Sequence, residues 1–408
     1  MTSGRLQRCL AVMVILAVPC TALSDVITEW NEKAVASTIT AKQLPFVGAR
    51  TLALVHTAMF DAVNSIQGRY TPYKVKLDVP AGASSEAAAA AAAHATLVAL
   101  FPEQKTSLDS AYTVSLAKIP AGEGKTAGVA VGEKVASQII SLRASDGSNA
   151  PNTYRPVTTA GVYIATTLPI GSQWGSVTPW LMQRTSQFRP GPPPQLTSSQ
   201  WARDCNEIKD IGGKTSTLRT PEQSDIARFW VITGPSSWDP IVRQLADIPT
   251  RSLIDNARLF AFVETAAADA YIAVFDAKYT YNFWRPVTAI RNGDLGGNPG
   301  MSRVADWEPL IDTPLHPEYP CAHCITSAAA GTVLESEFGR GAVPTLTMTS
   351  ATAPGVVRKW NSIKEWMDEV SAARMYGGIH YRNSTIVGQE MGRKIGELAV
   401  QNYLKPVQ

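Results

Sequence analysis

Apolar and small residues recur at helical spacing along most of this chain. The clearest runs cover residues 85–101, 221–232 and 356–375, and a period near 3.6 residues predicts α-helices. Alternation with a period of two, which is typical of half-buried strands, is scarce. The pattern therefore predicts an all-α protein in which helices pack as bundles.

One helical pattern occurs twice. Residues 49–62 read ARTLALVHTAMFDA and residues 257–270 read ARLFAFVETAAADA, so eight of fourteen positions are identical. A weaker echo, Gly-x3-Gly-x-Lys, starts at Gly128 and again at Gly388. Because the two matches keep their order, we interpret the chain as two related helical bundles that arose by internal duplication.

Residues 148–199 separate the two halves and are rich in Pro, Thr, Gly and Ser. Such a segment does not sustain a regular helix. Trp174 and Trp180 within it need to be buried, which favours an ordered crossover packed on the body over a flexible linker between independent domains. We therefore assign residues 25–147 to the first bundle and residues 200–408 to the second.

The first 24 residues have the pattern of a secretory signal peptide. Arg5 and Arg8 precede an apolar run at residues 10–18, and small residues follow at 22–24. No later run reaches the roughly 18 uninterrupted apolar residues of a membrane span. These features predict a secreted or periplasmic protein without a transmembrane segment.

Composition narrows the function classes. With 408 residues, of which 45% are hydrophobic and 17% charged, the chain can bury a large core. The net charge of +3 comes from scattered Lys and Arg, so no basic stripe indicates nucleic-acid binding. After the predicted leader three cysteines remain, Cys205, Cys321 and Cys324, and this odd number excludes a disulfide framework but allows one bridge.

Five residues of the last third combine the groups that an oxyanion pocket needs. Three fixed cations can neutralise an anion of charge two or three, and two histidines can supply a nucleophile or ligand and a proton donor. The residues occur in three segments, Lys278-x6-Arg285-Pro286, Pro320-Cys321-Ala322-His323 and Arg374-x5-His380. Each segment alone also has a structural explanation, such as a solvated basic face or a packed histidine, so the prediction depends on their joint occurrence.

Local geometry supports this grouping. Lys278 and Arg285 are seven apart, so one continuous helix would place them on the same face until Pro286 ends it. Cys321 and Ala322 are predicted at the N-terminus of the next helix, where free backbone N–H groups suit an anion and His323 lies in the first turn. The pair Gly377-Gly378 permits a tight bend, so that Arg374 and His380 can face one ligand.

The three segments resemble the signature of the superfamily that contains vanadium-dependent haloperoxidases and type 2 phosphatidic acid phosphatases. That signature reads Lys-x6-Arg-Pro, then Pro-Ser-Gly-His, then Ser-Arg-x5-His-x3-Asp. The opening Glu29-Trp30-Asn31, the first repeat and the crossover also resemble bacterial secreted haloperoxidase-like members. The resemblance implies a vanadate cofactor, or phosphate in its place, and small-molecule substrates, which are either peroxide and halide or a phosphate ester.

The resemblance also assigns roles. His380 would bind vanadium, and His323 would act as the acid–base residue. The anion's oxygens would be held by Lys278, Arg285, Arg374 and the backbone amides of Cys321 and Ala322. His316 stands where haloperoxidases vary between Phe and His, and the His version resembles bromoperoxidases, so oxidation of bromide or iodide is favoured. The alternative is an acid phosphatase that hydrolyses phosphate monoesters or lipid phosphates through a phosphohistidine at His380.

Four positions depart from the signature: Cys321 for Ser, Ala322 for Gly, Ala373 for Ser, and Ser384 for the trailing Asp. A thiol is a weaker donor than a hydroxyl and is oxidised by peroxide. Without the trailing carboxylate, the group that orients His380 is left open.

Two further readings also stay open, a Cys-x2-Cys zinc pair with His316 as an extra ligand and a bundle without activity. The apolar faces of two bundles leave room for a homodimer.

Overall fold

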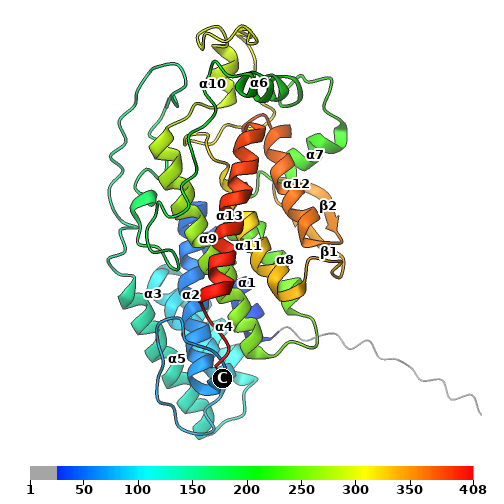
Figure 1. Cartoon of the computed structure of the whole chain (residues 1–408). Helices are drawn as coiled ribbons and strands as arrows, with labels where there is room; N and C mark the ends of the chain where they lie inside the picture. The colour runs from blue at the N-terminus through cyan, green and yellow to red at the C-terminus, as the bar shows by residue number, and fades with distance from the viewer. Residues whose placement is uncertain (1–24, 408) are drawn as a thin grey trace, which may run out of the picture.

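The computed structural model describes residues 25–407, and the regular secondary structure of this part is helical apart from one small hairpin (Figure 1). The predicted leader lies outside the described residues. The α-helices are α1 (Val26–Thr40), α2 (Pro45–Gln67), α3 (Ser85–Leu100), α4 (Lys105–Ala117), α5 (Glu123–Leu142), α6 (Ser199–Ile211), α7 (Pro221–Phe229), α8 (Asp239–Ala246), α9 (Leu253–Tyr281), α10 (Pro286–Arg291), α11 (Ala322–Phe338), α12 (Ile363–Tyr376) and α13 (Arg382–Asn402). Short 3-10 turns occupy Pro102–Gln104, Trp174–Ser176 and Gly234–Ser237, and the hairpin pairs β1 (Leu346–Ser350) with β2 (Ala353–Trp360). The predicted all-α class is confirmed.

Helices α2 and α9, which carry the two copies of the longer repeat, pack against each other in the middle of the molecule (Figure 1). Each also packs on a later helix of its own half, α2 on α3 and α9 on α11. Both helices are buried along most of their length, as their small and apolar residues predict.

The aspartate that ends each copy of the repeat has the same function in both halves. The Asp61 carboxylate accepts backbone N–H groups from three consecutive residues, Tyr73 to Val75, at 2.6–2.9 Å. The Asp269 carboxylate likewise accepts three, from Trp180 to Met182, at 2.7–2.8 Å. Each buried carboxylate therefore fixes an irregular segment against its helix, and three charge-assisted hydrogen bonds satisfy the buried charge.

The glycine echo marks two equivalent helix crossings, α5 on α3 and α13 on α11. A Cβ added at Gly132 would lie 2.3 Å from the Ala88 carbonyl oxygen, and one at Gly392 would lie 2.3 Å from that of Ile325. Both distances are shorter than any van der Waals contact, so these crossings require glycine. The repeated Gly-x3-Gly-x-Lys pattern therefore reflects a packing constraint that the two halves share.

The crossover packs on the body, as its aromatic residues predict. Trp174 and Trp180 are almost fully buried, and the Trp174 ring lies 4.5 Å from that of Phe46 on α2. The segment contains only one short 3-10 turn and contacts α9. In Figure 1 it runs along the outside of the central helices and joins the two halves.

Two local predictions were wrong. The stretch 356–375 is not one helix, because Val356 lies in β2 and α12 starts only at Ile363, after the N-cap Ser362. Lys278 and Arg285 do not share a helix either. Helix α9 ends at Tyr281 with Asn282 in the left-handed conformation, and Arg285 is the N-cap of α10, whose first residue is Pro286. The proline therefore begins a new helix and does not end the old one.

Helix α2 is long and apolar enough to cross a membrane by length and composition, although no uninterrupted apolar run was found there. In the structure, 89% of the most apolar stretch of this helix is buried inside the protein. A core helix of a globular protein has the same properties.

His56, in the middle of α2, gives a testable pH dependence. Its ring stacks on Phe260 at 4.8 Å, Nε2 accepts a hydrogen bond from Asn31 at 3.0 Å, and burial together with the Arg243 charge lowers its pKa to about 3. The unfolded chain binds a proton near pH 6.5 and the folded chain does not, so the stability from neutral His56 is present above pH 6.5 and is lost as the pH falls toward 3.

We therefore expect the free energy of unfolding of the wild type to fall, relative to a His56→Gln variant, by about 1.4 kcal/mol per pH unit below pH 6.5. Urea titrations of both proteins at several pH values between 7.5 and 4.5 measure this difference. A difference that stays constant across the range would show that His56 has the same pKa in the folded and the unfolded chain, and would contradict the lowered value.

Candidate active site

The predicted site residues converge at one end of the second bundle. Arg374 lies in the last turn of α12, His323 in the first turn of α11, and His380 in the short connection between α12 and α13. Together with His316 and Ala322, these residues line one cavity of about 200 Å³. Three segments that are far apart in the sequence thus meet, as predicted.

The cavity walls come from both halves of the chain. Pro45 and Phe46 from α2 and Ile170 from the crossover face it, together with Tyr271 and Phe275 from α9. These mostly apolar side chains surround the histidines and the arginine, an arrangement that is typical of small-molecule sites. The sequence did not indicate these residues, since their proximity depends on how the crossover folds over the bundles.

A glycine fixes the bend between Arg374 and His380. Gly378 has φ of +76°, and a Cβ there would lie 2.3 Å from the carbonyl oxygen of Gly212 at the end of α6. Both the left-handed conformation and the close approach of the two backbones require glycine. This confirms the predicted tight bend and explains how α12 can present Arg374 while the next residues present His380.

His380 is held by two groups on opposite sides of its ring. Its Nδ1 lies 2.7 Å from Oε1 of Glu318, and its Nε2 lies 3.1 Å from Nη1 of Arg285. Because a guanidinium can only donate, Nε2 must accept and the ring proton is assigned to Nδ1, which donates to Glu318. Burial, reinforced by Arg285, lowers the pKa of His380 well below its usual value, so the ring is neutral and its lone pair is on Nε2.

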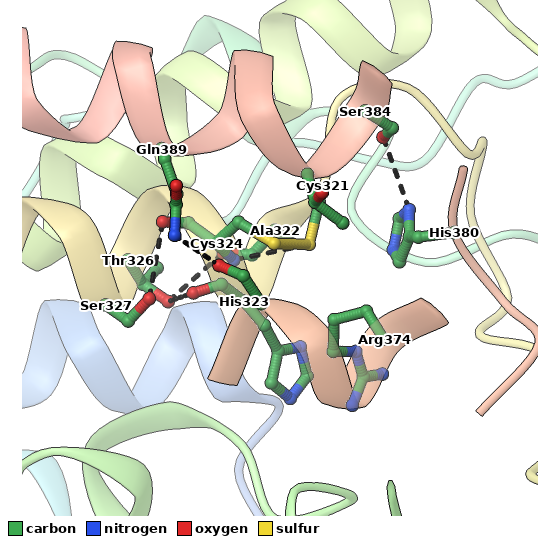
Figure 2. Close-up of a disulfide and its surroundings, with 12 residues drawn as sticks. Cys321, Ala322, His323, Cys324, Thr326, Ser327, Arg374, His380, Ser384 and Gln389 are labelled. Carbon is green, nitrogen blue, oxygen red and sulfur yellow. Dashed lines mark hydrogen bonds between the residues drawn. A yellow bond between two sulfur atoms is a disulfide. The ribbon is translucent and has the colours of Figure 1, made fainter. Parts of the chain in front are cut away.

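Glu318 is the residue that sequence reasoning missed. It is fully buried, and its Oε1 also accepts the backbone N–H of Tyr381 at 3.1 Å, so it fixes the connection that carries His380. Burial raises the pKa of Glu318 to about 7, while Lys278 and Arg285 oppose that rise. Ser384, at the position of the expected aspartate, is 3.4 Å from His380 Nδ1 (Figure 2). The orienting carboxylate therefore comes from the turn before α11 and not from α13.

Lys278 and Arg285 both bind the turn that carries Glu318. Lys278 donates to the carbonyl oxygens of Pro317 and Glu318 at 2.8 and 2.7 Å, and Arg285 donates through Nε to that of His316 at 2.9 Å. Both side chains are almost fully buried, and the residues that line the cavity include neither Arg285 nor Lys278. Its two hydrogen bonds hold the turn in place, which the sequence did not predict.

His316 also binds Arg285. Its Nδ1 lies 3.0 Å from Arg285 Nη2, and its ring meets Phe275 edge to face with centroids 5.5 Å apart. Burial, together with Lys278 and Arg285, lowers the pKa of His316 well below its usual value. A neutral imidazole that faces the cavity is therefore fixed at the position assigned to halide tuning.

The segment after α7 supplies carbonyl groups to two site residues. His323 Nε2 donates to the carbonyl oxygen of Ile232 at 3.1 Å, and Arg374 donates through Nη1 to that of Trp230 at 2.5 Å. Burial and the Arg374 charge lower the pKa of His323, so its lone pair is on Nδ1. Figure 2 shows His323 and Arg374 extending into the same space.

Cys321 differs from its predicted role. It is the N-cap of α11, as expected, but its N–H donates to the carbonyl oxygen of Ser384 at 3.2 Å and is therefore directed to α13. Ala322, the first residue of α11, does line the cavity. Cys321 and Cys324 form a disulfide (Figure 2). The zinc reading was wrong, because no group of three or more His, Cys, Asp or Glu side chains within residues 25–407 is placed to hold a metal ion. The single bridge that the sequence allowed is present.

The site carries a surplus of buried positive charge. Lys278, Arg285 and Arg374 are each at most 2% exposed, and Glu318 is the buried carboxylate that faces Lys278 and Arg285. Arg374 Nε is also buried without a hydrogen-bond partner among residues 25–407. Buried cations require counter-charges, so a multiply charged oxyanion fits this donor set, and His380 Nε2 is the atom that can bind its central atom.

The comparisons with known proteins agree with this geometry. The family model described as the VCPO second helical-bundle domain matches residues 258–408. Vanadium chloroperoxidase from Curvularia inaequalis is 25% identical in a match that covers 41% of this chain and 37% of that protein. The chain therefore matches well under two thirds of that curated relative's length.

Solved structures cover more of the chain. The crystal structure of the first bacterial vanadium-dependent iodoperoxidase superposes with a TM-score of 0.80 and 26% identity, covering 96% of this chain and 99% of that one. An apo-type bacterial vanadium-dependent chloroperoxidase gives a TM-score of 0.71 at 18% identity, covering 87% and 92%. The second likeness concerns the fold alone.

Proposed function

Because the chain belongs to the vanadium haloperoxidase family, we propose that it oxidises a halide with hydrogen peroxide, using vanadate held at His380 as its cofactor. The observation that carries this proposal is the buried cluster of three cations around a neutral histidine whose lone pair is fixed on Nε2. Bound vanadate supplies the electrophilic centre that activates hydrogen peroxide.

The side chains of this chain have distinct roles in that reaction. His380 would hold vanadium through Nε2, and Arg285 Nη1, which now donates to that nitrogen, would then be free to donate to the anion. Arg374, which lines the cavity and has an unpartnered Nε, would neutralise part of the anion's charge. His323 is neutral with its lone pair on Nδ1, so it accepts a proton from peroxide first and returns it later.

The apolar walls limit the water around the reacting atoms. Phe46, Tyr271 and Phe275 are buried and line the cavity together with Arg374. In such surroundings, charge–charge and charge–dipole interactions are stronger than in water. Bromide or iodide is the proposed halide, because His316 stands at the halide-tuning position and an iodoperoxidase is among the similar structures.

We further propose that the protein works in an oxidising compartment outside the cytoplasm. The leader-like pattern of residues 1–24 supports this location.

A paired assay on the purified protein tests the proposed function. Iodide and bromide oxidation are measured with peroxide and vanadate, and hydrolysis of a chromogenic phosphate monoester is measured without vanadate. We expect vanadate-dependent halide oxidation. Phosphate release that vanadate inhibits, with no halide oxidation, would instead assign the chain to the phosphatase branch of the superfamily.

Phosphate is expected to compete with vanadate for the same cations. With phosphate at ten times its own Kd, the apparent Kd for vanadate should rise about tenfold, because the two anions exclude each other at one site. Activity regained by phosphate-treated protein over a vanadate titration measures the shift, and sodium sulfate at equal ionic strength is the control. Equal shifts with both salts would mean that the site does not recognise the phosphate group.

A further inference from the structure

The disulfide between Cys321 and Cys324 lies against the candidate site. Cys321 is the N-cap of α11 and Cys324 is in its first turn, with Cα atoms 5.4 Å apart. The two residues between them, Ala322 and His323, line the cavity. Figure 2 shows the bridge above the side chains of His323 and Arg374. A small molecule admitted to the cavity therefore comes within one helical turn of both sulfurs.

The pair is closed to larger molecules. Both cysteines are fully buried, and Gly388 of α13 packs directly on them, since a Cβ there would lie 2.7 Å from the Cys321 carbonyl oxygen and 3.1 Å from the Cys324 Cβ. The Cys321 N–H is bound by the Ser384 carbonyl of the same helix. A protein thiol cannot reach the sulfurs through this packing. The cysteines themselves do not line the cavity but their neighbours Ala322 and His323 do, so the pair lies behind the cavity wall, where a molecule has to be as small as hydrogen peroxide to arrive.

We propose that Cys321 and Cys324 form a second peroxide-reactive site, a dithiol that peroxide converts into the disulfide seen here. This inference rests on the proposed function only in that peroxide is the substrate drawn into the cavity. The result is a cysteine that keeps the N-cap position while its sulfur is protected from the irreversible oxidation steps that a lone thiol undergoes.

The chemistry balances with peroxide as the only oxidant. The Cys324 N–H donates to Cys321 Sγ at 3.3 Å, and a helix N-terminus favours a thiolate at that position. The Cys321 thiolate attacks one peroxide oxygen, the O–O bond breaks, and a sulfenic acid and one water result. The Cys324 thiol then attacks the sulfenic sulfur, the S–S bond forms, and the sulfenic oxygen leaves as a second water. Two thiols and one peroxide yield one disulfide and two waters.

Cys205 is a matched internal control. It is fully buried like the pair, it is the free cysteine among the described residues, and burial raises the pKa of its thiol to about 12. It packs with Trp201 and Ile208 in the smaller core cluster and does not line the cavity. Its oxidation therefore reports how a buried thiol of this chain reacts without the paired geometry.

The test begins with the full chain made in a reducing cytosol and purified without oxygen. One equivalent of hydrogen peroxide is added, and alkylation in denaturant followed by peptide mass mapping scores Cys205, Cys321 and Cys324 over time. We expect Cys321 and Cys324 to become a disulfide at least about tenfold faster than Cys205 loses its thiol. Equal rates at the three cysteines, or a pair that stays reduced, would overturn the inference.

Two variants complete the test. In Cys324→Ser, the Cys321 sulfur lacks its partner, so excess peroxide should yield sulfinic or sulfonic acid, seen as added mass of two or three oxygens. In Cys205→Ser, disulfide formation should proceed as in the wild type. An unmodified Cys321 thiol in Cys324→Ser would also overturn the inference. The readout needs neither vanadate nor halide, so a failure of the proposed function is detected separately.

Discussion

Replacement of His380 by alanine is expected to reduce halide oxidation by at least ~10³-fold, the effect typical of losing a residue that binds the reacting centre. The ring supplies Nε2, whose lone pair is fixed by the Nδ1–Glu318 hydrogen bond. In the wild type, Arg285 donates to Nε2 of this ring and Glu318 accepts from its Nδ1. Neither side chain can take over the role of the Nε2 lone pair. Steady-state iodide oxidation at saturating vanadate measures the loss.

The control for this variant is His94→Ala. His94 stacks on Tyr112 with centroids 4.2 Å apart and pairs with Asp109 in the first half of the chain, away from the cavity. Its loss should leave halide oxidation within about twofold of the wild type. Thermal unfolding of both variants separates a catalytic defect from misfolding. A folded His380→Ala protein that keeps more than a tenth of the activity would contradict the assignment of vanadate to His380.

The helices could be predicted from the sequence where the spacing of small and apolar residues was clear over many turns. Small and apolar residues at helical spacing identified α2, α3 and α9 because these helices are buried on nearly all faces. The end of β2 was misread as the start of a helix, since a strand of eight residues gives too few periods to separate it from a helix. The local signal that was available there is Ser362 with Glu365 three residues later, a helix start that places the boundary correctly.

The sequence predicted those site residues whose side chains carry a charge or an imidazole suited to an anion. Arg374, His323 and His380 were identified from the residue types and the order of the segments, and the structure brings them to one cavity. Glu318 was missed because its role depends on the turn being folded onto Lys278 and Arg285. The carbonyl groups of Trp230 and Ile232 carry no side-chain signal at all, so only tertiary structure can reveal them.

Glu318→Gln should separate the two ways in which an anion can bind at this site. Glutamine keeps the size of the side chain but removes the charge that accepts the Nδ1–H of His380. Vanadate depends on the basicity of His380, so its affinity should fall about 10- to 100-fold, as is common when a partner of a metal-binding histidine is lost. Phosphate, held by the cations alone, should bind several-fold more tightly, because a nearby negative charge has been removed.

The opposite signs make this prediction sharper than a loss of activity alone. Isothermal titration with each anion measures the two affinities. Ser384→Ala is the matched control, because the Ser384 hydroxyl is 3.4 Å from Nδ1 of His380. Loss of this hydroxyl should change either affinity by less than about threefold. Ser384→Asp in the Glu318→Gln background places a carboxylate next to Nδ1 from α13, the source in the family signature, and should restore part of the vanadate affinity. A parallel loss of both anions in Glu318→Gln would mean that Glu318 only supports the fold of the turn, whereas unchanged vanadate affinity would mean that the carboxylate does not orient His380.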